Sequence, residues 1–264
     1  MMRVYGWKPD RPDFRDQIAE TEATAQAALP ISFSLRSTFP APYDQAELGS
    51  CTSNALAGAV TRLLMKENKL TLATAATVSG TPSRLFIYYN ERVIEGTVSQ
   101  DSGATIRDGI KALNTLGTCF ESTWPYIISQ FARKPSVTAY KNALQDVVKS
   151  YQRINTADKT TKKTVLTQGS AIAFGFSVYD SFESAAVEAS GLVPMPSKSE
   201  SLLGGHAMLI VGYDDNKVIN GQKGAYECRN SWGPNWGDHG YCYMPYSYLD
   251  DNSLADDFWI IKLI

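Results

Sequence analysis

One cysteine, Cys51, stands where a polar, proline-flanked stretch opens directly into a helical pattern. Its thiol is therefore predicted in the first turn of a helix, close to unpaired backbone N–H groups and the positive end of the helix dipole. Both features favour the thiolate, which is the nucleophilic form of cysteine. We interpret Cys51 as a nucleophile that requires a base nearby.

A thiolate of this kind needs an imidazole that shares its charge and later protonates a leaving group. The sequence offers two histidines. His206 begins an apolar run directly after Gly204 and Gly205, which lack side chains and let backbone or ligand approach closely. His239 lies in a glycine-bounded turn beside Asp238, where a hydrogen-bonded turn residue is expected. His206 is therefore the candidate base.

Two amide side chains complete the set. Asn230 can bond the second imidazole nitrogen of His206 and hold the ring in one orientation. Trp232 is predicted on the same strand face, where it could shield that bond from water. Gln45 can donate its amide N–H to an oxyanion, together with the backbone N–H of Cys51. These groups predict acyl transfer through a thioester.

The elements that must position these groups change in type along the chain. Helical spacing of apolar residues predicts helices, and after about residue 168 short β-branched and aromatic segments predict strands. The predicted helices cover 50–68, 83–94, 102–117 and 137–148, and the predicted strands cover 170–179, 205–215, 224–233, 239–246 and 258–264. Helices followed by strands indicate an α+β protein with two lobes.

Composition excludes several classes of protein. A net charge of −2 leaves no basic surplus for nucleic acid or anionic lipid, and no apolar run approaches the ~20 residues of a membrane span. The first residues of this sequence lack the apolar core of a signal peptide, so we expect a cytoplasmic protein or export by a non-classical route. Cys119, Cys228 and Cys242 lack zinc-site spacing, and no metal or cofactor is expected. Cys228 and Cys242 are interpreted as buried apolar residues, and Cys119 could pair with one of them or stay free.

Three segments, DQAELGSC (44–51), GGHAMLIVGYD (204–214) and NSWGPNWGDHGY (230–241), resemble the papain-like cysteine peptidases. The resemblance spans roughly residues 30–264. It implies a helical left lobe, mainly 45–150, and a β-rich right lobe, mainly 165–264, with the substrate cleft between them. We therefore expect a monomer that binds peptide or protein substrates.

The resemblance also implies substrate-binding residues. DSGA (101–104) is similar to the family's glycine-rich turn, in which Gly103 would let the substrate backbone approach, and Trp232 and Gly205 are further candidates. Three positions depart from the family pattern. Leu48 replaces a disulfide cysteine, and Thr52 replaces a tryptophan after the nucleophile. Gly205 departs as well, because many members carry aspartate there. These departures resemble a bacterial branch of the family.

Residues 1–29 form a separate arm in this interpretation. Pro9 and Pro12 among alternating charges favour extended backbone, and an alanine-rich stretch follows. The arm could lie across the cleft as an inhibitory, propeptide-like segment, or it could be a strap that stabilises the fold. In either case Trp7 and Phe14 are the expected anchors.

The predicted function is peptide-bond hydrolysis by a cysteine endopeptidase. The same side chains could instead transfer the acyl group to an amine, as a transamidase, or cleave an isopeptide. A degenerate fold used only for binding is the remaining alternative, and the intact set of Cys51, His206, Asn230 and Gln45 argues against it.

Overall fold

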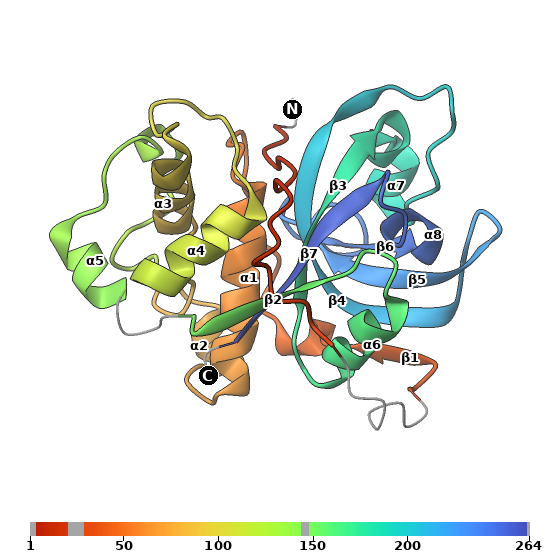
Figure 1. Cartoon of the computed structure of the whole chain (residues 1–264), viewed down its shortest axis with the longest axis horizontal. Helices are drawn as coiled ribbons and strands as arrows, with labels where there is room; N and C mark the ends of the chain where they lie inside the picture. The colour runs from red at the N-terminus through yellow and green to blue at the C-terminus, as the bar shows by residue number, and fades with distance from the viewer. Residues whose placement is uncertain (1–3, 21–28, 144–147, 263–264) are drawn as a thin grey trace.

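Helices gather on one side of the molecule and strands on the other (Figure 1). The computed structural model describes residues 4–20, 29–143 and 148–262. Its helices are α1 (Cys51–Lys66), α2 (Leu72–Ala75), α3 (Arg84–Glu95), α4 (Ile106–Leu116), α5 (Val137–Ala143), α6 (Lys159–Thr167), α7 (Ala185–Ser190) and α8 (Tyr246–Leu249). Its strands are β1 (Ser32–Ser34), β2 (Ser150–Ile154), β3 (Ile172–Tyr179), β4 (Leu202–Ile219), β5 (Gln222–Arg229), β6 (Tyr241–Pro245) and β7 (Ala255–Lys262). The α+β, two-lobed prediction is confirmed.

The strands form one sheet in the order β2-β7-β3-β4-β5-β6, with β1 added to β4. All pairings between these strands are antiparallel. In the β4–β5 ladder Leu209 lies opposite Arg229, the last residue of β5. His206 on β4 and Asn230, which follows β5, are therefore brought to the same end of this pair of strands.

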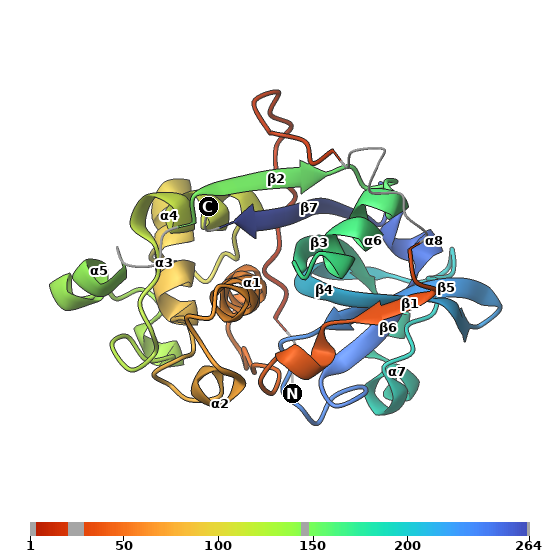
Figure 2. The same cartoon turned by 90° about the horizontal axis from the view of Figure 1, so that it is seen from below.

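Helix α1 lies between the other helices and the sheet, in contact with α3 and α4 on one side and with β3 and β4 on the other. Small residues permit this close packing. A methyl group on Gly58 would lie 3.2 Å from the Leu209 side chain, so α1 approaches β4 across a glycine. Figure 2 shows α1 between α3 and α4 on one side and the strands on the other, and Cys51 is the first residue of this helix.

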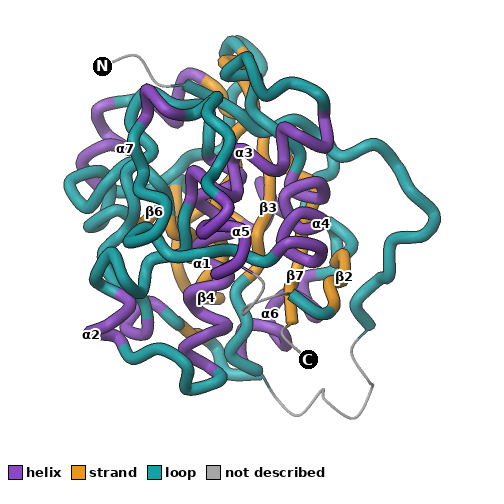
Figure 3. Tube along the Cα trace, turned by 90° about the vertical axis from the view of Figure 1, so that its left-hand side faces the viewer, coloured by secondary structure: helices purple, strands orange, loops and turns teal. Residues whose placement is uncertain are grey.

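The helices on the far side of α1 are bounded by caps that the sequence encodes locally. Ser83 accepts a hydrogen bond from the Phe86 N–H at the start of α3, and Gly96 ends that helix in the left-handed region. Thr105 caps α4 in the same way as Ser83, and Gly117 ends it as predicted. Figure 3 views the molecule from this side, with α3, α4 and α5 in front of the strands.

Residues 4–20 are extended and run along the boundary between helices and strands, coloured red in Figure 1. Farther along, Ile18 forms an isolated parallel bridge with Arg153 of β2, so the arm also lies beside this edge strand of the sheet. Trp7 is buried, as expected of an anchor. Phe14 is 98 % exposed, so the prediction that it anchors the arm was wrong. Most of the alanine-rich stretch lies outside the described residues.

Several short elements were not predicted. The single-turn helix α2 and the elements β1, β2 and α6 lie outside the predicted helices and strands. The predicted helix 137–148 is described only to Ala143. Within the described residues, no helix is both long and apolar enough to cross a membrane.

Candidate active site

The Cys51 thiol is fully buried at the first position of α1. Burial raises its pKa to about 11, because a thiolate there would lose its hydration. Backbone N–H groups of Ala207, Gly6 and Thr52 act in the opposite direction and lower the pKa. Their effect is smaller than that of burial, so the thiolate expected from the helix terminus is not favoured in this arrangement.

His206 and Asn230 meet in the structure, with 2.8 Å between His206 Nε2 and Asn230 Oδ1. The same Asn230 oxygen accepts the Ser231 N–H at 2.8 Å. The Ser231 N–H requires an acceptor, so this Asn230 atom is the amide oxygen, and an imidazole that bonds it must donate from a protonated Nε2. In the neutral ring the lone pair is then on Nδ1, which is the nitrogen able to take a proton.

Aromatic rings enclose this pair. The Trp232 ring lies 5.0 Å from the His206 ring, centroid to centroid, at an interplanar angle of 30°. Phe176 packs edge-on against the imidazole at 5.7 Å, and His206 is fully buried. Trp232 follows β5 and forms an isolated bridge with Asp44, so its predicted position on a strand face was wrong, although it does cover the imidazole.

Gln45 is fully buried, and both Oε1 and Nε2 of its side-chain amide form hydrogen bonds. The Oε1 atom accepts a hydrogen bond from Ser231 Oγ at 2.6 Å. The Nε2 atom donates to the main-chain oxygens of Leu48, at 3.0 Å, and Val4, at 3.2 Å. Sequence reasoning missed Ser231, although it lies within the NSWG segment that drew attention to Asn230.

Backbone hydrogen bonds join the arm to both sides of the site. The Ala104 N–H donates to Gly6 O at 2.7 Å, and the Lys8 N–H donates to Ala104 O at 3.1 Å. On the other side, the Trp7 N–H donates to Gly205 O at 2.9 Å. Gly103 does not make these bonds, but it must be glycine. Its φ is +66°, and a Cβ at this position would lie only 2.0 Å from Gly6 O.

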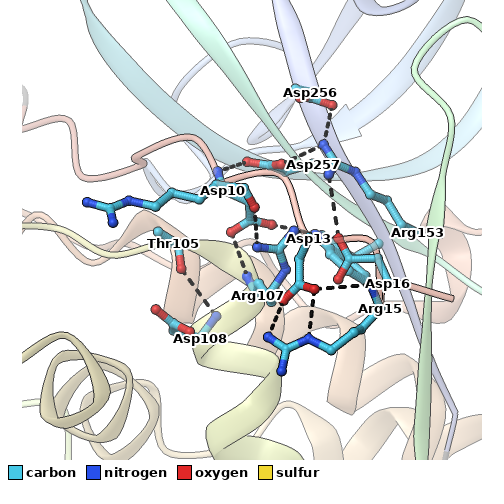
Figure 4. Close-up of polar contacts among 12 residues, drawn as sticks. Asp10, Asp13, Arg15, Asp16, Thr105, Arg107, Asp108, Arg153, Asp256 and Asp257 are labelled. Atoms are coloured by element: carbon cyan, nitrogen blue, oxygen red, sulfur yellow. Dashed lines mark hydrogen bonds and ion pairs between the residues drawn. The ribbon is translucent and has the colours of Figure 1, made fainter.

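A buried cluster of charges holds the next part of the arm (Figure 4). The Asp10 carboxylate accepts hydrogen bonds from the Arg107 backbone N–H at 3.2 Å and from the Trp259 indole N–H at 2.9 Å. The Asp10 N–H donates to Asp257 Oδ2 at 2.8 Å, and Arg153 binds Asp257 Oδ1 at 3.0 Å. Burial raises the pKa of Asp257 to about 8, and the charge of Asp10 adds to this rise.

The sequence contains one further histidine and three further cysteines. His239 occupies an exposed turn with a φ of +54°. All four cysteines are free and buried, and Cys228 lies opposite Cys242 in the β5–β6 ladder. In the described part of the chain, no group of three His, Cys, Asp or Glu side chains is arranged to hold a metal ion.

Comparison with known proteins agrees with this geometry. A sequence model described as "Papain family cysteine protease" matches residues 29–257. The crystal structure of xylellain, a cysteine protease from Xylella fastidiosa, is 40 % identical, covers 100 % of this chain and 99 % of its own, and has a TM-score of 0.87. An uncharacterized peptidase C1-like protein of Acanthamoeba polyphaga mimivirus is 38 % identical, over 98 % of this chain and 87 % of its own length.

A more distant structure supports the fold alone. Digestive procathepsin L 3 of Tenebrio molitor is 18 % identical, with a TM-score of 0.70 over 98 % of this chain and 76 % of its own. The family match and the xylellain identity go further than this, since both extend through the segments that contain Cys51, His206 and Asn230. The chain belongs to the papain family of cysteine proteases and is a bacterial-type cysteine peptidase.

Proposed function

We propose that this peptidase is an endopeptidase that hydrolyses peptide bonds through a Cys51 thioester and is held inactive by residues 4–10 of its own arm. One observation carries the proposal. Gln45 Nε2, the donor expected to meet an oxyanion, donates instead to the main-chain oxygen of Val4. An arm carbonyl thus takes the hydrogen bond that a substrate would need.

The catalytic steps follow from the groups described above. The Cys51 sulfur attacks the scissile carbonyl carbon, and its proton passes to His206 Nδ1. Gln45 Nε2 and the Cys51 backbone N–H bind the oxyanion of the tetrahedral intermediate. The C–N bond then breaks, His206 protonates the departing amine, and the acyl group remains on Cys51 as a thioester.

Hydrolysis of the thioester reverses these roles. His206 removes a proton from water, the hydroxyl attacks the thioester carbonyl, and the acid leaves as Cys51 regains its proton. Asn230 holds the imidazole through Nε2 in both halves of the reaction. Asn230 carries no charge, so it orients the ring without changing the charge balance of the Cys51–His206 pair.

Steric evidence supports inhibition by the arm rather than a merely stabilising strap. A methyl group on Gly6 would lie 1.8 Å from Gly49 O, so the arm backbone presses against the loop that leads into Cys51. The Gly6 backbone N–H is also close enough to the Cys51 thiol to lower its pKa. A substrate carbonyl cannot reach that sulfur while Gly6 occupies this position.

Labelling by an epoxysuccinyl inhibitor, followed by intact mass, tests both parts of the proposal. We expect slow labelling of the full chain and fast labelling of a Gly6→Val chain, in which the added side chain forces the arm away from Gly49. Cys51→Ala should remove labelling and turnover. If the wild-type and Gly6→Val chains label equally fast, the arm does not inhibit and only stabilises the fold. Transfer of the acyl group to an added amine would indicate a transamidase.

A further inference from the structure

We propose that Tyr126 is a positioning residue for catalysis, whose hydroxyl sets the spacing between two oxyanion donors, the Gln45 side chain and the Cys51 backbone N–H. This inference rests on the proposed function, because it takes these two groups as the donors that bind the oxyanion. Tyr126 lies between α4 and α5, outside the three segments by which the family was recognised. Its place beside the donors is therefore a product of the tertiary structure.

The two donors stand at opposite ends of one loop, residues 45–51, and the Tyr126 hydroxyl contacts both ends. It donates to the main-chain oxygen of Gln45 at 3.0 Å. It also lies 2.6 Å from Ser50 Oγ, and Ser50 directly precedes Cys51. One oxygen atom thus connects the residue that carries the first donor with the neighbour of the second.

The direction of these hydrogen bonds follows from the groups that make them. A tyrosine has one O–H, and here the Gln45 carbonyl takes it, since a carbonyl can only accept. Ser50 must then donate its own O–H to Tyr126, and Ser50 Oγ in turn accepts from Asn54 Nδ2 at 3.1 Å. The donors therefore all point one way, from the Asn54 amide to the Gln45 carbonyl. Hydrogen bonds in such a chain strengthen one another, which holds the loop more firmly than separate contacts would.

Tyr126 is itself held in place from the face of its ring. The Arg84 guanidinium lies 4.0 Å from the centre of this ring. Arg84 is anchored in turn by Glu121 at 2.7 Å and by the main-chain oxygen of Asp44 at 2.9 Å. Burial raises the pKa of the Tyr126 hydroxyl to about 12, so the hydroxyl stays protonated around neutral pH. The loop therefore meets a fixed donor.

Loss of this hydroxyl would keep both oxyanion donors but release their spacing. The Gln45 backbone N–H would still donate to Ser231 O at 2.8 Å. The Gly49 N–H would still donate to the Asp101 carboxylate at 3.0 Å. The loop would keep these contacts, whereas its two ends would no longer share a partner. Oxyanion stabilisation depends on donors placed in advance, and a misplacement of about 1 Å costs roughly 100-fold in rate.

The test changes one atom in the full chain opened by Gly6→Val. Tyr126→Phe removes the hydroxyl and keeps the ring against Arg84. We expect kcat/KM with a fluorogenic peptide to fall at least 10-fold, by the same factor at pH 6 and pH 8. Alkylation of Cys51 by iodoacetamide, a displacement that forms no oxyanion, should stay within about twofold of the parent chain. A merely structural role would change both rates together.

Tyr43→Phe is the matched control. The Tyr43 ring also lies beside Arg84, with 4.9 Å between the guanidinium and the ring centre. Its hydroxyl, however, bonds Thr61 Oγ1 of α1 at 2.9 Å. We therefore expect Tyr43→Phe to keep kcat/KM within about threefold of the parent chain. Equal losses in Tyr43→Phe and Tyr126→Phe would overturn the inference.

A double-mutant cycle shows whether Tyr126 acts through Gln45. In a Gly6→Val chain that also carries Gln45→Ala, Tyr126→Phe should lower kcat/KM by less than about threefold, because the donor that it positions is absent. An undiminished loss in that background would contradict the inference. If Tyr126→Phe does not fold, Ser50→Ala breaks the same chain of hydrogen bonds and should also slow hydrolysis at least 10-fold while alkylation is kept.

The outcomes separate this inference from the proposed function. If the Gly6→Val chain cleaves peptides and Tyr126→Phe leaves that rate unchanged, only the inference fails. If hydrolysis and alkylation fall together in Tyr126→Phe, the inference also fails, because the thiol itself is then displaced. If a folded Gly6→Val chain neither cleaves any peptide nor labels at Cys51, the proposed function fails, and this inference fails with it.

Discussion

Gln45 Nε2 lies 3.2 Å from the main-chain oxygen of Val4, and this hydrogen bond links the candidate oxyanion donor to the N-terminal arm. The two residues are separated by 41 positions in the sequence, and neither position alone suggests the contact. The Gln45 amide thus binds a carbonyl oxygen, as the reaction requires, but this carbonyl belongs to the arm and not to a substrate. Arm position and catalytic readiness are therefore expected to vary together.

Removal of the oxyanion donor should slow the reaction without unfolding the protein. We predict that Gln45→Ala lowers kcat of an arm-opened chain by roughly 10²–10³-fold, the usual effect of losing one such donor. Ser231→Ala should give a smaller loss, since it frees the Gln45 amide to rotate but leaves the donor present. The measurement is kcat and KM with a peptide substrate. A loss confined to KM would contradict the assigned role.

Shortening the buried anchor of the arm should open the site. Trp7→Ala removes an indole that is only 8 % exposed, and such losses cost about 3 kcal/mol or more, which converts to about 100-fold in the opening equilibrium. We expect the labelling rate of Cys51 to rise by about that factor. Phe14→Ala is the matched control, because Phe14 is 98 % exposed and should have no effect. Similar labelling rates in the two variants would show that the arm does not control access to Cys51.

The Cys51 pKa should depend on the arm. In the closed chain, burial raises it to about 11, so the rate of alkylation by iodoacetamide should still be rising at pH 9 to 10. Opening the arm readmits water and lets the helix terminus and His206 stabilise the thiolate. We predict that the alkylation midpoint of the Gly6→Val chain lies well below that of the wild type. Coincident profiles would show that the thiol pKa does not depend on the arm.

Arm docking should weaken as pH rises. With the arm docked, burial and then the charge of Asp10 raise the pKa of Asp257 to about 8, and burial raises the pKa of Asp10 as well. Raised values mean that the docked form holds more protons, so this contribution is fully present at low pH and is lost as pH rises through about 8. Arg107 and Arg153, which also face these carboxylates, limit the rise.

Hydrogen exchange of the Trp7 and Asp10 amides, corrected for base catalysis, measures this effect directly. Protection should fall as pH rises from about 4 to about 8 in the wild type, level off above that, and change less in Asp257→Asn, which cannot titrate. Protection that instead falls on acidification would indicate that other groups control the arm.

Local patterns were sufficient for the elements that carry the candidate groups. The apolar repeat after Cys51 predicts α1, Gly117 marks the end of α4, and the aromatic, β-branched runs predict β3 to β7, because helix and strand periodicities report burial within one segment. The three segments that contain Gln45, Cys51, His206 and Asn230 were enough to recognise the family, which the comparisons then confirmed. The catalytic roles of these side chains remain predictions.

Contacts between distant segments were decided only by the tertiary structure. Phe14 and Trp7 look alike as apolar residues in a polar arm, yet only Trp7 meets a slot, because Gly175 and Gly205 become neighbours when β3 pairs with β4. The position of Asp257 depends in turn on a bulge in another strand pair. The periodicity of one segment does not predict such pairings, because their geometry arises only when elements far apart in the sequence pack together.

The Cys51 thiol shows the same division within a single residue. Its place at a helix N-terminus could be read from the sequence, and that place alone favours a thiolate. Burial reverses this preference, because the cost of removing a charge from water exceeds the stabilisation by nearby N–H groups. The sequence by itself determined the nucleophile's chemical type and local setting, whereas the tertiary structure decided its protonation state, through the solvent that the fold excludes.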